Sequence, residues 1–181
     1  MNGDGSRDHR RGESIYIGSA RSNWETYTGG QPDGSNRNRI IGNRIWDAPA
    51  ELIDIKEGTS FGLVEGNVFD GSQLIGGRND EGGSWVDCKG TDYTFRNNTG
   101  SSTSGVAFEV QDVFKGSGLS GLRNVFESNR YVGSGPDYFI WIAASAEGGT
   151  TPTSPYHHNA VACDNDAGGS ALGLSNIPCG P

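Results

Sequence analysis

An all-β solenoid is the fold class that this sequence predicts, and two observations carry the prediction. The first is that apolar residues alternate with charged ones over residues 51–58, which is the period of a strand with one buried face. The pattern recurs at residues 13–18, 87–89 and, more loosely, 109–111. One strand-rich unit every ~20–50 residues is typical of a solenoid, and the lack of a long 3.6-residue period favours strands over helices.

A ladder of asparagines is the second observation. Five asparagines each follow an apolar position by three residues: Asn43, Asn67, Asn98, Asn129 and Asn165. They are 24, 31, 31 and 36 residues apart, so we expect them to occupy equivalent turns of successive coils and to hydrogen-bond along the stack. An antiparallel β-sandwich is the alternative, because its short strands also alternate, but hairpin turns of the Asn-Gly or Asp-Gly kind are scarce here.

The elements can be placed in order along the chain. We expect a flexible, charged lead-in over residues 1–12, a first strand at Ser14–Ser19 and a loop over residues 20–36. The remaining strands, loops and coils are expected at residues 37–46, 50–69, 70–83, 84–98, 101–129, 131–144, 150–155 and 156–181. Together residues 1–181 are expected to form one domain, long enough for a core.

The central coil, residues 50–69, has a charged outer face. Strict alternation places Ile53 and Ile55 inside and Leu52 outside. Asp54 and Lys56 then lie side by side on the outer face, where chemistry is possible.

Composition limits the partners. The chain has 30 glycines among 181 residues and a net charge of −8, with no basic run outside two adjacent arginines, so nucleic acid is not expected as a partner. No apolar segment approaches the ~20 residues that span a bilayer, so no membrane contact is expected. The polar N-terminus does not resemble a signal peptide, and the chain enters its first strand without a cap, so we expect that it is a fragment or has lost a leader.

Three cysteines are present. A disulfide between Cys163 and Cys179 would link the C-terminal tail, residues 164–181, to the last coil. The chain is rich in Gly, Ser, Thr and Asn, which is typical of secreted proteins and favours this disulfide over free thiols in a cytosolic protein. Cys88 is expected to be a small buried hydrophobic residue. No cysteine or histidine spacing indicates zinc.

A patch of opposite charges is the candidate site. Asp54 and Lys56 would stack beside Asp87 and Lys89 at one strand spacing, ~4.8 Å. A solvated salt-bridge ladder is one interpretation. The functional interpretation is that a desolvated lysine acts as a base while the second protonates a leaving oxygen or neutralises a substrate carboxylate. Glu51 could hold a hard cation such as calcium.

The sequence also resembles a known group of proteins. Residues 12–19, 51–56 and 85–90 resemble the core of right-handed parallel β-helix proteins of the pectate-lyase-like group, and most closely polysaccharide lyase family six, which contains alginate lyases and chondroitinase B. The resemblance, over residues 12–98, implies a single-stranded right-handed parallel β-helix of about five coils.

The resemblance also implies roles for residues. It implies Lys56 as the base that abstracts the proton next to a uronate carboxylate, Glu51 as a calcium ligand, and Lys89 in place of the family's arginine. Three departures stand against it: Lys89 is not arginine, Pro49 stands where a second acidic ligand is expected, and Tyr16 replaces an arginine of the first strand.

Two classes of function remain open. One is an enzyme, a secreted lyase that cleaves an acidic, uronic-acid-containing polysaccharide by β-elimination, with Asp54 and Asp87 also contacting substrate. The other is a non-catalytic secreted β-helix that binds glycan or acts as a scaffold. Either would use Trp24, Trp85 and Arg78, the last in the long loop at residues 70–83.

Two further classes receive less support. Asp54 and Asp87 could pair as in a retaining hydrolase, but the neighbouring lysines favour the ionised form of both. An ice-binding surface needs ranks of threonine or serine, whereas the outer positions here are charged.

Overall fold

The structure, a computed structural model, describes residues 12–76, 83–113, 120–143 and 158–181. Its strands are short: β1 Ile15–Ile17, β2 Arg39–Ile41, β3 Arg44–Trp46, β4 Ile53–Ile55, β5 Leu63–Glu65, β6 Val68–Asp70, β7 Val86–Cys88, β8 Thr94–Arg96, β9 Thr99–Ser101, β10 Phe108–Val110, β11 Val125–Glu127, β12 Arg130–Tyr131, β13 Tyr138–Ile142, β14 Ala160–Val161 and β15 Gly173–Ser175. The described part of the chain otherwise contains a single turn of 3₁₀-helix, η1 (Arg21–Asn23), and one four-residue helix, α1 (Trp24–Tyr27).

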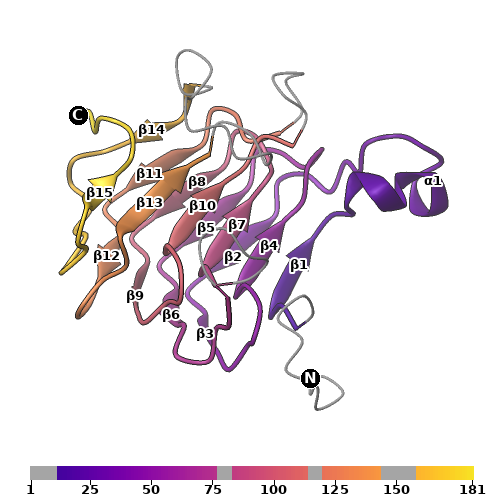
Figure 1. Cartoon of the computed structure of the whole chain (residues 1–181). Coiled ribbons are helices and arrows are strands. Elements are labelled where there is room, and N and C mark those ends of the chain that lie inside the picture. The colour runs from indigo at the N-terminus through magenta and orange to yellow at the C-terminus, as the bar shows by residue number, and fades with distance from the viewer. Residues whose placement is uncertain (1–11, 77–82, 114–119, 144–157) are drawn as a thin grey trace.

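The strands form three sheets in which every pairing is parallel. Sheet A has the order β1-β4-β7-β10-β13-β15, sheet B the order β14-β11-β8-β5-β2, and sheet C the order β12-β9-β6-β3. The chain visits the sheets in turn, so each of the first four coils adds one strand to each sheet, and β13, β14 and β15 extend only sheets A and B (Figure 1). The predicted parallel β-helix of about five coils is confirmed.

The turns between sheets B and C contain the asparagine ladder. The side-chain amide of each asparagine from Asn43 to Asn129 donates to the side-chain oxygen of the next, at 3.1, 3.0, 2.9 and 2.9 Å. Each acceptor oxygen also receives the backbone N–H of the asparagine one coil earlier. The predicted ladder is therefore confirmed, and it satisfies polar groups that the turns bury.

These turns also correct the predicted strand boundaries. Residues 37–46 were expected to be one strand, but they are split into β2 and β3, and the second half of the central coil is split in the same way into β5 and β6. The residue before the ladder asparagine adopts a left-handed conformation, with φ of 67° at Gly42 and 62° at Gly66. This conformation bends the chain from sheet B into sheet C, and glycine adopts it without steric cost.

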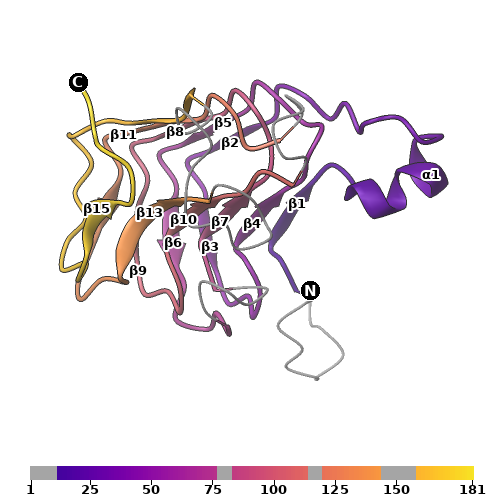
Figure 2. The ribbon, with the colours of Figure 1, turned by 45° about the horizontal axis from the view of Figure 1, so that its top comes forward.

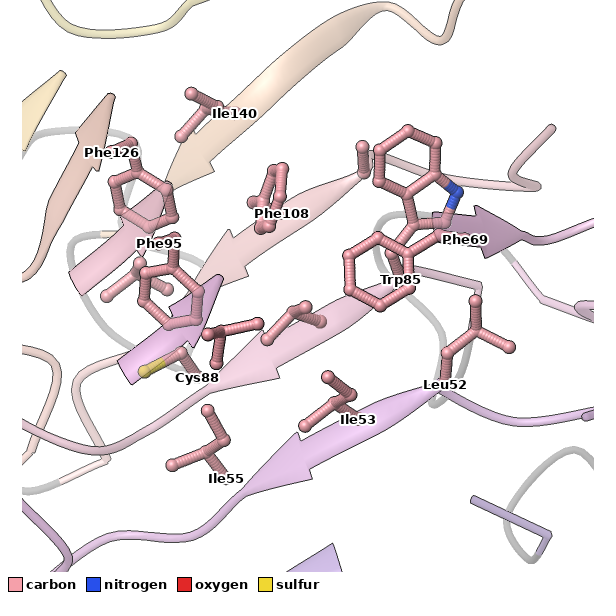
Figure 3. Packing of buried hydrophobic residues seen from close by; sticks show 14 of the residues in the cluster. Leu52, Ile53, Ile55, Phe69, Trp85, Cys88, Phe95, Phe108, Phe126 and Ile140 are labelled. Atoms are coloured by element: carbon pink, nitrogen blue, oxygen red, sulfur yellow. The ribbon is translucent and has the colours of Figure 1, made fainter. Parts of the chain in front are cut away.

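A stack of rings fills the interior (Figure 3). Phe95 and Phe126 stack with their centroids 4.7 Å apart, and Trp85 stacks on Tyr131 at 5.2 Å with the rings almost parallel. Phe108 contacts both groups edge-on. Aromatic residues from successive coils thus pack against one another along the core, beside aliphatic residues such as Ile53 and Ile140.

The predicted outward position of Leu52 is wrong, since Leu52 is fully buried in this core. Leu52 and Ile53 both face inward because the chain bends where it enters sheet A, and the equivalent residues Trp85 and Val86 of the next coil do the same. Alternation holds only beyond this corner.

The predicted loop at residues 20–36 contains the helices η1 and α1, which project beyond β1 at the N-terminal end of the stack (Figures 1 and 2). The backbone N–H of Arg21 donates to Glu57 at 2.6 Å, and its guanidinium donates to the carbonyl of Val113 at 3.1 Å. These bonds tie the base of the loop to later coils.

The predicted disulfide between Cys163 and Cys179 is confirmed, and it closes the last part of the chain. Cys88 is a free, buried thiol, as expected. Neither described helix has the length or apolar character needed to cross a bilayer. The lead-in at residues 1–11, the loop residues 77–82 and the loop predicted at residues 150–155 lie outside the described residues.

Candidate functional site

The outer face of sheet A brings four functional side chains into one line. Strand register aligns Tyr16 of β1 with Asp54 of β4, Asp54 with Asp87 of β7, and Asp87 with Glu109 of β10. We call Asp54, Asp87 and Glu109 the acidic row. Neighbouring strands in such a sheet are ~4.8 Å apart, so the three carboxyl groups lie close together on one surface.

Two lysines meet this row. The Lys56 ammonium lies 2.5 Å from one Asp54 oxygen, and the Lys89 ammonium lies 3.4 Å from the other. Lys89 also contacts Asp87 directly. The structure thus brings together the two aspartates and two lysines that the sequence singled out.

This cluster is not solvated. Asp54 and Asp87 are only 2% and 4% exposed, so the interpretation as a solvated salt-bridge ladder is wrong. One oxygen of Asp87, Oδ1, is buried without a hydrogen-bond partner among the described residues. Buried ion pairs of this kind interact strongly, and each charge depends on its partner.

Burial raises the pKa of several carboxyl groups. The pKa of Glu51 rises to about 7, because the group is desolvated and faces the negative charges of Asp87 and Asp54. The pKa of Glu109 rises to about 8 through burial and the charge of Asp87, with Lys89 opposing the rise. Burial also raises the pKa of Asp87. Glu109 therefore carries its proton at neutral pH, and Glu51 carries its proton about half of the time.

Lys89 behaves in the opposite way. Burial lowers the pKa of its ammonium, but the charges of Asp87 and Asp54 outweigh burial and hold the pKa well above that of an ordinary lysine. Lys89 is therefore a permanent positive charge and a poor donor or acceptor of protons at neutral pH.

Tyr16 is the functional candidate that sequence reasoning missed. Its side chain is 47% exposed, and the Lys56 nitrogen lies 4.9 Å from the centroid of its ring. Burial of the phenol raises its pKa above the ordinary value, partly offset by Lys56, so the hydroxyl keeps its proton. The match of residues 13–18 with residues 51–56 already aligned Tyr16 with Asp54, and this was the signal that could have found it.

A group of carboxylates could hold a metal ion. Glu13, Glu51 and Asp54 each offer an oxygen, and these oxygens all lie within 4.8 Å of one another. An all-oxygen donor set fits a hard cation. Both oxygens of Asp54 also contact lysine ammonium groups, so an ion bound here would share Asp54 with Lys56 and Lys89.

Three other predicted residues lie elsewhere. Trp85 is fully buried in the aromatic core, which corrects its assignment as a glycan contact because no face of its ring reaches the surface. Trp24 is also buried, in α1, where its ring nitrogen donates to the carbonyl of Ser19 at 2.8 Å. Arg78 lies outside the described residues.

The fold and the charged outer sheet place the chain in a class, the parallel β-helix proteins. Within that class it is similar to the alginate lyase from Paenibacillus sp. str. FPU-7, whose crystal structure superposes with a TM-score of 0.71 at 30% sequence identity. The match covers 94% of this chain and 52% of that protein, so the chain spans about half of its length. No family model and no curated protein matches the sequence. The predicted resemblance to an alginate lyase is confirmed at the level of structure.

Proposed function

We propose that this protein is a secreted polysaccharide lyase that cleaves a uronic-acid-containing glycan by β-elimination. The observation that carries the proposal is the pairing of Lys56 with Tyr16 above the acidic row, on the outer face of sheet A. The structural similarity to an alginate lyase supports the same chemistry. The disulfide is consistent with an oxidising compartment outside the cell.

The reaction divides between a base and an acid. Lys56 acts as the base and takes the proton on C5, next to the uronate carboxylate. The electron pair of that C–H bond forms the C4–C5 double bond, and the bond from C4 to the bridging oxygen breaks. Tyr16 then gives its phenolic proton to the departing oxygen. Because burial raises the pKa of Tyr16, the proton is available at neutral pH.

Lys89 supplies charge rather than protons. Abstraction of the C5 proton pushes negative charge onto the carboxylate of the sugar, and a fixed cation nearby stabilises that charge. Lys89 keeps its charge because Asp87 and Asp54 hold its pKa high. In this role Asp87 and Asp54 orient Lys89. Of the two roles predicted for the second lysine, we therefore propose neutralisation of the substrate carboxylate and not protonation of the leaving oxygen.

We further propose calcium as the ion for the carboxylates Glu13, Glu51 and Asp54. When bound, a divalent cation would neutralise the carboxylate of the glycan and make the neighbouring proton more acidic. Glu51 would have to give up its proton, so occupancy would increase as the pH rises past about 7.

A non-catalytic glycan-binding protein is the second candidate. The observation that favours it is the close engagement of both lysines by buried aspartates, which is also how a purely structural ion cluster is built. A protein of this kind would bind the glycan and leave it intact.

The test is a survey of polymers. The protein is incubated with alginate, polygalacturonate, glucuronan and chondroitin sulfate, with added calcium or with EDTA, and the ultraviolet absorbance of the unsaturated uronate product is followed. We expect a rise with one polymer, larger with calcium than with EDTA. Folded protein that binds a polymer but produces no absorbance with any of them would favour the second candidate.

A further inference from the structure

Strand β13 presents two aromatic side chains on the outer side of sheet A. Its core-facing residues Phe139, Ile140 and Ile142 are fully buried. Tyr138 and Trp141 are partly exposed instead and do not belong to the core cluster. Their ring centroids are 5.5 Å apart with an interplanar angle of 44°, so the two rings form one aromatic surface.

This aromatic surface continues the acidic row. Trp141 is in register with Glu109, so the line that starts at Tyr16 and runs through the acidic row ends at Trp141. At ~4.8 Å per strand, Trp141 lies about 14 Å from Asp54 along the sheet. Strand spacing is close to the length of one unit, about 5 Å, of an extended 1,4-linked sugar chain. About three sugar units therefore separate the two positions.

The surface beside Tyr138 leaves space for a sugar ring. Tyr138 pairs with Gly173 of β15, and a Cβ atom added at Gly173 would meet none of the described residues within 4 Å. The C–H groups on one face of a pyranose are weakly positive and apolar, and they pack on the negative face of an aromatic ring. Tyr138 and Trp141 are partly exposed and offer such faces on the outer side of sheet A, between β10 and β15.

We propose that Tyr138 and Trp141 form a distal glycan-binding subsite, which stacks on a sugar ring about three units from the bond that is cleaved. The inference rests on the proposed function for the identity of the ligand, a uronate-containing chain lying across the strands of sheet A. The subsite lengthens the binding surface from Tyr16 to β13 and so favours polymers over short oligomers.

The charge between the two positions agrees with this arrangement. Glu109 separates Asp87 from Trp141, and an ionised Glu109 would repel a polyuronate there. Burial raises the pKa of Glu109 to about 8, so the group is protonated at neutral pH and can donate a hydrogen bond to the glycan. An anionic chain can then cross this part of the sheet.

The test uses the length of the substrate as its variable. Values of kcat/KM are measured for mannuronate oligomers of three and seven units with the wild type, Trp141→Ala and Trp141→Phe. Trp46→Ala is the matched control, because it removes a tryptophan that is exposed on β3 of sheet C. Binding of the heptamer is measured separately by calorimetry in the Lys56→Ala background, with and without Trp141→Ala, so that binding is judged without cleavage.

We expect Trp141→Ala to lower kcat/KM for the heptamer about tenfold, with a much smaller loss for the trimer, which cannot extend from the cleavage point to β13. Trp141→Phe should recover most of the loss, and Trp46→Ala should show none. Equal losses at both lengths, or no loss of heptamer affinity in the calorimetric comparison, would overturn the inference. If no variant cleaves either oligomer, mannuronate is not the substrate of the proposed lyase, and the calorimetric comparison alone decides whether the subsite exists.

Discussion

Replacing Lys89 with methionine should destabilise the protein strongly, and more strongly at high pH. Lys89 contacts Asp87 and Asp54, both almost fully buried, and no other lysine contacts Asp87 among the described residues. Removing one partner of a buried ion pair costs about 3–5 kcal/mol, since the remaining charge is left without compensation. Asp87 loses its lysine contact while Asp54 keeps Lys56, so we expect a loss within this range.

The pH dependence follows from the same contacts. Burial already raises the pKa of Asp87 and Lys89 opposes the rise, so without the ammonium the folded state holds a proton on Asp87 at pH values where the unfolded chain has released it. The folded variant then binds more protons than the unfolded chain, so its stability falls as the pH rises. The loss relative to wild type should therefore be larger at pH 8 than at pH 5.

The assay is urea unfolding of wild type and Lys89→Met at the two pH values. Arg123→Met is the matched control, because it removes the exposed ion pair of Arg123 with Asp92, in which the guanidinium side chain is 48% exposed. Such pairs contribute about 0–1 kcal/mol. A loss for Lys89→Met as small as that of the control, or a loss that shrinks as the pH rises, would refute the assignment of Lys89 as the cation that the buried cluster requires.

Three further predictions concern the fold and the site. Asn98→Ala should lower the free energy of unfolding by about 3–4 kcal/mol in urea titrations, because four buried side-chain hydrogen bonds are lost at about 1 kcal/mol each. Asn43→Ala, at the end of the ladder, should lower it by only about 1 kcal/mol. Equal losses for the two variants would contradict the ladder. The pKa of Glu109 is raised to about 8 from an ordinary 4.5, so its contribution to stability falls as the pH rises from about 4.5 through 8. Between pH 5 and pH 8.5 the free energy of unfolding should therefore fall more for wild type than for Glu109→Gln. Equal falls for the two proteins would argue against the raised pKa. Reduction of the disulfide between Cys163 and Cys179, which are 16 residues apart, should lower stability by about 3 kcal/mol, and an unchanged melting temperature after reduction would show that it adds nothing.

The solenoid was predictable because its signal repeats. Each ladder asparagine satisfies its neighbour's backbone and side chain, so the same residue is needed once per coil, and the spacing becomes visible in one sequence. The pairing of Asp54 with Asp87 was predictable for the same reason, since equivalent residues of successive coils lie in register on one sheet.

Other features depend on geometry that the repeat does not encode. Strict alternation put Leu52 outside, but the corner at the entry to sheet A turns two consecutive residues inward. Trp85 is of a residue type that often contacts glycans, yet the same corner places it in the core.

The sequence also did not reveal the role of Tyr16 as a neighbour of Lys56. Tyr16 was interpreted as a departure from a pattern; the repeat aligned it with Asp54, but the contact of its ring with Lys56 is seen only in the structure. Similarly, the degree of burial that raises the pKa of Glu109 comes from the packing of strands on either side of β10, which no spacing reveals.

The most direct test of the central claim is the initial rate of unsaturated product formation from the polymer that the survey identifies, measured with wild type, Lys56→Ala and Tyr16→Phe. General acid–base groups contribute about 10²–10⁴ in rate, so each variant should lose at least about 100-fold while remaining folded. Wild-type rates in Lys56→Ala would contradict the account, as would new reducing ends that accumulate without ultraviolet absorbance, because the latter is the product of hydrolysis rather than elimination.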